Sequence, residues 1–145
     1  MLRKVKIMSC YNFLYPITIT EGGTFDQRFR WRTGDPLTPV DLTGFTSLTQ
    51  IRVKPADEAP LIELPHKDSA WEADGETGFY LDENPETGIY RLYINDEDTI
   101  GLCAAHKDIT GIYNAFMYSP AGEAVFRQYG PVTILAAAAW KAVTP

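Results

Sequence analysis

Residues 24–36, TFDQRFRWRTGDP, alternate two kinds of side chain from Phe25 to Arg32. One set contains Phe25, Gln27, Phe29 and Trp31, and the other contains Asp26, Arg28, Arg30 and Arg32. In an extended strand, successive side chains point to opposite faces of the sheet. The Gly-Asp-Pro that follows is typical of a turn. The stretch therefore predicts a half-buried β-strand with an aromatic inner face and an arginine-rich outer face.

Similar short runs, separated by Gly, Pro and Asp turns, follow along the chain. The expected strands lie within residues 13–20, 24–32, 46–54, 61–64, 78–81, 88–94, 111–118, 123–129 and 132–135. The only expected helix covers residues 95–105, with Asn95 or Asp96 as its cap and Ile100, Leu102 and Cys103 toward the core. Residues 111–118 and 123–129 are expected to form a β-hairpin around SPAG at 119–122. Short strands at this spacing favour an all-β fold, an immunoglobulin-like antiparallel β-sandwich with one short helix or helical turn. Its core is expected to contain Phe29, Trp31, Leu48 or Ile51, Leu92 and Phe116.

The 145 residues suit one domain, which we place at residues 22–135. Residues 1–21 are expected to form an N-terminal arm or an edge strand, and residues 136–145 a C-terminal tail that includes Trp140. Both ends carry more apolar side chains than a disordered tail. We expect contacts with neighbouring subunits to order one or both ends, and the alternative is that they form an extra edge strand and a C-terminal strand of the same domain.

The net charge of −6 disfavours nucleic-acid binding, because the chain as a whole repels a phosphate backbone. The arginines at 28, 30 and 32 are therefore expected to form a protein interface, together with Trp140. No apolar run is long enough for a membrane span, and the N-terminal residues lack the apolar core of a signal peptide. Cys10 and Cys103 form no CxxC pair, which favours a reduced setting, with one long-range disulfide as the alternative.

Catalytic and metal-binding patterns are missing from the sequence. His66 and His106 each precede a lysine and are expected in surface loops. Asp96, Glu97 and Asp98 suit a helix N-terminus better than a cation site, because negative charge there offsets the helix dipole. We expect no enzymatic activity, no metal and no cofactor. A carbohydrate-binding module or small glycosidase stays open as an alternative, since tryptophans and tyrosines can form a sugar platform.

Three segments, residues 22–54, 83–102 and 111–134, together resemble small tailed-bacteriophage virion proteins with an immunoglobulin-like β-sandwich. The chain is similar to the N-terminal domain of phage baseplate upper proteins. The matching features are Phe29 and Trp31, DLTGF at 41–45, QIR at 50–52, TGI at 87–89, the turn at 96–102, YNA at 113–115 and GPVT at 130–133. Asn114 departs from the family pattern, which has aspartate there.

The resemblance implies a non-enzymatic structural component of a bacteriophage virion, in the tail, baseplate or neck. Such a protein assembles in the cytoplasm of the bacterial host, as a ring or trimer, with other virion proteins as partners. It needs no nucleic acid and no membrane. A capsid decoration protein is the alternative within the same class. In the bend at 41–45, Asp41 is expected to accept backbone N–H bonds and Gly44 to take a positive φ.

Because no metal site is expected, a chelator is predicted to leave the stability unchanged. Thermal unfolding with and without prolonged EDTA treatment should give the same melting temperature. A fall of several degrees that added Ca²⁺ or Zn²⁺ reverses would show that the chain holds a structural ion.

Overall fold

The computed structural model describes residues 10–57, 59–67, 75–103 and 106–137. The elements are β1 (Tyr11–Leu14), β2 (Ile17–Thr20), β3 (Phe25–Arg30), β4 (Arg32–Thr33), β5 (Thr38–Pro39), β6 (Thr46–Arg52), β7 (Ile62–Lys67), β8 (Gly78–Leu81), the 3-10 turn η1 (Pro85–Thr87), β9 (Ile89–Ile94), α2 (Asp96–Thr99), β10 (Ile109–Tyr118) and β11 (Ala124–Leu135). The all-β class expected from the sequence is confirmed.

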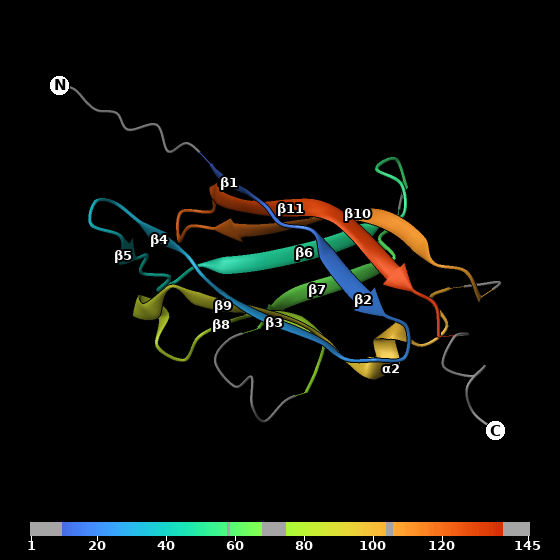
Figure 1. Cartoon of the computed structure of the whole chain (residues 1–145). Coiled ribbons are helices and arrows are strands. Elements are labelled where there is room, and N and C mark those ends of the chain that lie inside the picture. The colour runs from blue at the N-terminus through green and yellow to red at the C-terminus, as the bar shows by residue number, and fades with distance from the viewer. Residues whose placement is uncertain (1–9, 58, 68–74, 104–105, 138–145) are drawn as a thin grey trace.

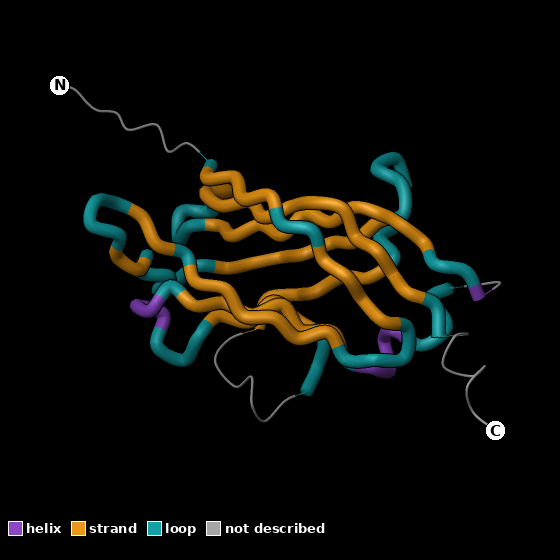
Figure 2. Tube along the Cα trace, viewed as in Figure 1, coloured by secondary structure: helices purple, strands orange, loops and turns teal. Residues whose placement is uncertain are grey.

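One mixed nine-stranded sheet curls into a half-barrel (Figures 1 and 2). Its order is β1-β11-β10-β6-β7-β8-β9-β3, with β2 also paired to β11, and β4 and β5 form a separate ribbon. The pairs β1–β11, β2–β11 and β7–β8 are parallel, whereas the sequence led us to expect an antiparallel arrangement throughout. The immunoglobulin-like sandwich is therefore not confirmed, because one continuous sheet replaces two facing sheets.

The hairpin of β10 and β11 is the longest ladder, and the sequence predicted it around the turn SPAG. Within this turn, the Gly122 N–H donates to the Ser119 carbonyl at 2.7 Å. Along its other edge, β11 pairs first with β1 and then with β2. At the join, a Cβ on Gly130 would lie 2.9 Å from the Tyr15 carbonyl oxygen, so the close approach of the two chains requires glycine.

The inner face of β3 follows the predicted alternation. Phe25 and Trp31 are buried and Phe29 packs against the core, whereas Asp26, Arg28, Arg30 and Arg32 are exposed. The Trp31 ring lies 4.7 Å from that of Phe126 on β11. The interior of the half-barrel is therefore an aromatic core built from both ends of the sheet.

Side chains, rather than a backbone ladder, join the two edges of the half-barrel. The Phe29 ring of β3 meets the Tyr15 ring edge-on at 5.0 Å. The Gln27 amide donates to the Tyr15 hydroxyl at 2.5 Å. Among the strands of the described residues, β3 pairs with β9 and β1 with β11, so these two strands end the sheet.

A polar network crosses the interior beside these rings. The Tyr90 hydroxyl donates to Gln128 Oε1 at 2.6 Å, and Gln128 Nε2 donates to the Tyr113 hydroxyl at 3.0 Å. The Tyr113 hydroxyl in turn donates to the Tyr15 carbonyl at 2.5 Å. Gln128 is 0% exposed, and its carbonyl and its amide each have a partner. The network thus fixes β9, β10 and β11 relative to one another.

The bend at 41–45 has the predicted geometry. Asp41 accepts hydrogen bonds from the Thr43 hydroxyl and the Thr43 backbone N–H, and these bonds lower the pKa of Asp41 below its usual value. Gly44 has a φ of 81°, in the left-handed region.

Two expectations about burial were wrong. The helix expected at 95–105 ends at Thr99; Asn95 caps it as predicted and Cys103 is buried, but Ile100 is 67% exposed. Phe116 was expected in the core and instead lies on the outer face of β10, beside Leu48. Both errors arose because a strong local pattern does not reveal where an element ends or which of two apolar faces is covered.

Trp31→Ala is predicted to lower the free energy of unfolding by roughly 3–5 kcal/mol, because it leaves a cavity against Phe126. Urea unfolding measures the loss. Leu37→Ala, at an exposed position on the loop between β4 and β5, is the control and should change stability little. Wild-type stability in Trp31→Ala would mean that the β3 faces are assigned the wrong way round.

Alkaline pH is predicted to destabilise the fold. Burial raises the pKa of Tyr113 to about 12 and that of Tyr90 further, above the value of about 10 in an unfolded chain. Below pH 10 both tyrosines are protonated in both states. Between pH 10 and 12 the unfolded chain releases protons that the folded chain keeps, so the free energy of unfolding falls.

Urea unfolding across this pH range tests the effect. Tyr113→Phe should flatten the pH dependence, and Tyr118→Phe, on the outer face, is the control. An unchanged pH dependence in Tyr113→Phe would contradict the assignment.

Candidate interaction surfaces

The three predicted interface arginines lie together on the outside of β3 and β4. Arg28, Arg30 and Arg32 are exposed and line a shallow hollow of about 450 Å³ whose floor includes Phe29 and Ile89. Asp82 is the only acid among the described residues of this hollow, and it accepts a hydrogen bond from Thr87. Trp140, the fourth predicted interface residue, lies outside the described residues.

A fourth arginine on the same side of the sheet has a structural role. Arg91 of β9 is 8% exposed, donates to both carboxylate oxygens of Asp26 at 2.7 and 2.9 Å, and lies against the rings of Tyr80 and Tyr93. The hydrogen bond to Asp26 raises the pKa of Arg91. Asp26 is therefore committed to Arg91, and among its described residues the hollow has three arginines and one acid, Asp82.

Arg91 was not predicted from the sequence as a structural residue. Its partner Asp26 lies 65 residues away in the sequence, and the pairing depends on the register that places Asp26 beside Arg91 and Tyr93. The neighbouring tyrosines in 90–93, YRLY, were a signal of an unusual outer face, but they did not identify the acid.

A second, acidic surface lies where β7 and β8 separate. The two strands pair only at His66↔Phe79 and Lys67↔Tyr80. Toward the start of β7 the sheet opens into a recess of about 540 Å³, here called the β7 slot. It is lined by Leu61, Ile62, Glu63, Glu76, Thr77, Asn95, Glu97 and Asp98.

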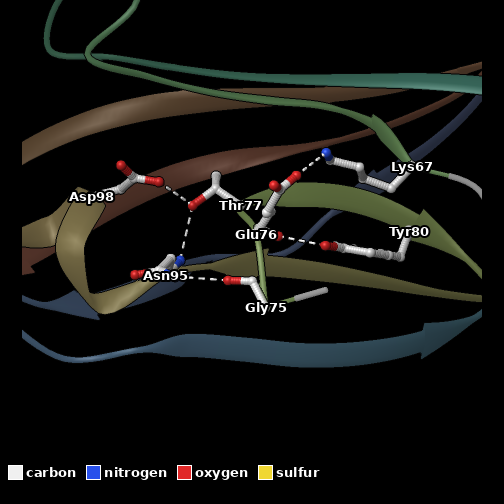
Figure 3. Close-up of polar contacts among 7 residues, drawn as sticks. All are labelled: Lys67, Gly75, Glu76, Thr77, Tyr80, Asn95 and Asp98. Atoms are coloured by element: carbon white, nitrogen blue, oxygen red, sulfur yellow. Dashed lines mark hydrogen bonds and ion pairs between the residues drawn. The ribbon is translucent and has the colours of Figure 1, made fainter. Parts of the chain in front are cut away.

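Polar contacts join residues 75–77 to Asn95 and Asp98 on one side and to Lys67 of β7 on the other (Figure 3). The Asn95 N–H donates to Thr77 Oγ1 at 2.9 Å, the Thr77 hydroxyl donates to Asp98, and the Asn95 amide donates to the Gly75 carbonyl at 2.7 Å. At the other end, Lys67 pairs with Glu76 at 2.5 Å, and the Tyr80 hydroxyl donates to the Glu76 carbonyl. Side-chain and turn contacts therefore stand where a longer backbone hydrogen-bond ladder between β7 and β8 would have continued beyond His66 and Phe79.

The β7 slot carries four carboxylates, from Glu63, Glu76, Glu97 and Asp98. In the part of the chain that the structure describes, no three His, Cys, Asp or Glu side chains converge as a metal site would need. The slot is thus an acidic recess beside the start of β7.

An aromatic recess of about 190 Å³ opens between the two edges of the half-barrel. The Tyr11 ring, 47% exposed, stacks on Trp31 at 5.9 Å and on Phe126 at 5.8 Å. Because Trp31 and Phe126 are buried, Tyr11 is the only one of the three rings that could offer a face to a sugar.

His66 was expected in a surface loop, and this was wrong, since it lies in β7. Its Nδ1 is 2.8 Å from Ser47 Oγ, which donates to the Phe79 carbonyl at 3.2 Å. Ser47 is only 5% exposed, so a substrate could not reach its hydroxyl. This pair joins β6 to β7 and β8 and is not arranged as a nucleophile with its base.

The cysteines do not pair with each other in this structure. Cys10 is partly exposed and Cys103 is buried, both as free thiols. Burial raises the pKa of the Cys103 thiol, which disfavours its reactive thiolate form.

No described helix combines the length and the apolar character needed to cross a bilayer. Comparison with known proteins gave no further guidance: no family model and no curated protein matches the chain.

Proposed function

We propose that this chain is a non-enzymatic structural component of a bacteriophage virion, in the tail, baseplate or neck, that assembles with itself and with neighbouring virion proteins. The order of motifs along residues 22–134 supports the virion assignment. The assembly role is supported by surface structure.

The observation that carries the assembly role is the arginine hollow on β3, the strand that ends the described sheet. Arginine beside aromatic and aliphatic side chains is typical of protein interfaces, where its planar guanidinium pairs with carboxylates. The hollow combines Arg28, Arg30 and Arg32 with Phe29 and Ile89. A chain with a net charge of −6 offers matching acidic surface on a second copy of itself.

The described residues give an enzymatic role no support. Ser47 and His66 of the described residues form a Ser–His contact, but Ser47 is buried. A carbohydrate-binding module would need an exposed aromatic platform, for which the described residues supply mainly Tyr11. Trp71 and Trp140 lie outside the described residues.

The location is tested directly in particles of the phage that encodes the chain. Gradient-banded virions should contain the protein by mass spectrometry, and labelled antibody should mark the tail, baseplate or neck in electron micrographs. Label spread evenly over the head would favour the decoration protein instead. Absence from purified virions despite expression in the infected cell would contradict a virion role.

Replacing Arg28, Arg30 and Arg32 with serine is predicted to leave the domain folded and to reduce its incorporation into virions at least about tenfold, as lost interface charge pairs weaken binding. A matched comparison uses Arg30→Ser with Arg32→Ser against Lys54→Ser with Lys107→Ser, two exposed lysines elsewhere. Equal incorporation of these two double variants would show that the hollow has no special role. Salt-sensitive binding of the wild type to duplex DNA would favour a nucleic-acid role instead.

A further inference from the structure

We propose that the edge of β3 and β4 binds an extended segment of a neighbouring virion protein as an added β-strand, and that acidic and apolar residues alternate in this segment. The inference rests on the proposed function and names the chemistry of one partner. It depends on three features of the edge: the direction of its backbone groups, its arginines, and the aromatic recess beside it.

Hydrogen bonds show which backbone groups of β3 point away from its neighbour β9. The Trp31 N–H donates to the Gly88 carbonyl at 2.9 Å, so Trp31 faces the β9 side. On the other side of β9, the Asp82 N–H donates to the Ile89 carbonyl at 3.1 Å, so Ile89 faces away from its register partner Arg30. Backbone groups of successive residues point to opposite sides of a strand. Arg30 therefore directs its N–H and its carbonyl away from β9.

The same direction holds for Arg32 of β4. The Val40 N–H donates to the Trp31 carbonyl at 3.0 Å, so β5 continues the sheet on the side of β9. Arg32 follows Trp31 and turns its backbone groups to the opposite side. Among the described residues, no backbone hydrogen bond reaches Arg30 or Arg32 from that side. An extended segment that adds a strand to a sheet edge supplies such bonds.

The arginine side chains determine the charge of the partner. Arg30 and Arg32 are exposed, and neither forms an ion pair with a described acid. Both line the arginine hollow and also the aromatic recess, so an added strand would lie between these two surfaces. Directly opposite residues of paired strands share a face, and opposite charges there are stabilising. An acid at every second position of the partner would therefore lie beside each arginine.

The aromatic recess accounts for the apolar positions of the partner. Beside Gln27 and Phe29 the side chain of Tyr15 joins the two edges of the half-barrel, whereas at Trp31 the recess opens between them. The described lining of the recess contains no acid. Its volume of about 190 Å³ is below the roughly 300–1,000 Å³ of small-molecule pockets, and suits one apolar side chain. Residues between the acids of an added strand would project toward this side.

A designed peptide probes the edge. The probe is GEVEFEVG, acetylated and amidated at its ends and fluorescently labelled, and its control is GEEEVVFG, which has the same composition without alternation. Fluorescence anisotropy should show saturable binding of GEVEFEVG and at least about tenfold weaker binding of GEEEVVFG. Equal binding of the two peptides, or no binding of GEVEFEVG, would overturn the inference.

Amide hydrogen exchange, followed by NMR, locates the contact. Saturating GEVEFEVG should slow exchange of the Arg30 and Arg32 N–H groups at least about tenfold, because the added strand accepts their hydrogen bonds. The Trp31 N–H already donates to Gly88, so it is the internal control and should change less. Unchanged exchange at both arginines would show that the peptide binds elsewhere, which contradicts the proposed edge.

Charge reversal tests the selection of an acidic partner. Arg30→Glu with Arg32→Glu should bind GEVEFEVG at least about tenfold more weakly than the wild type does, and should prefer the basic peptide GKVKFKVG. Lys54→Glu with Lys107→Glu changes the net charge equally and should keep the wild-type preference. A wild-type preference in the arginine variant would mean that Arg30 and Arg32 do not select the partner.

Methylation of the peptide backbone separates an added strand from charge attraction alone. N-methyl groups on the three glutamates of GEVEFEVG remove the N–H groups on one side of the extended peptide, and N-methyl groups on its apolar residues remove those on the other side. Only one set should weaken binding by about tenfold or more, because only one side of the peptide faces β3. Equal affinities of the two methylated peptides would rule out an added strand.

The two proposals fail in different ways. Reduced incorporation of Arg30→Ser with Arg32→Ser into virions, together with no binding of GEVEFEVG, overturns this inference and leaves the assembly role intact. Absence of the chain from purified virions contradicts the virion role, whatever the peptide does.

Discussion

The buried amide of Gln128 is the constraint on which the arrangement of the half-barrel depends. Burying an amide without partners costs several kcal/mol, roughly 2–7 by transfer measurements. Gln128 avoids that cost only if Tyr90 of β9 and Tyr113 of β10 both present their hydroxyls to it. Tyr113 also reaches the carbonyl of Tyr15, so the network positions the segment between β1 and β2. This network therefore fixes the curl of the sheet together with the aromatic contact between Tyr15 and Phe29 at its two edges.

Closure through side chains leaves strand edges open. A complete barrel would pair every backbone group, whereas here β3 ends the sheet and the first part of β7 has no described partner toward β8. Two surface recesses differ in their charged side chains: arginines line the hollow beside β3 and carboxylates line the β7 slot.

Local sequence determined the faces of β3, the β10–β11 hairpin, the bend at 41–45 and the Asn95 cap, because each depends on side-chain alternation or on hydrogen bonds between near neighbours. It also identified the exposed arginines, but not the slot. Tertiary structure alone decided the parallel pairings, the outward position of Phe116, the Arg91–Asp26 pair and the opening beside β7. The physical reason is that side-chain alternation along a strand separates its two faces but does not determine which other strand pairs with it. That choice depends on packing and hydrogen bonds between residues far apart in the chain, such as Gln128 with Tyr90 and Thr77 with Asp98.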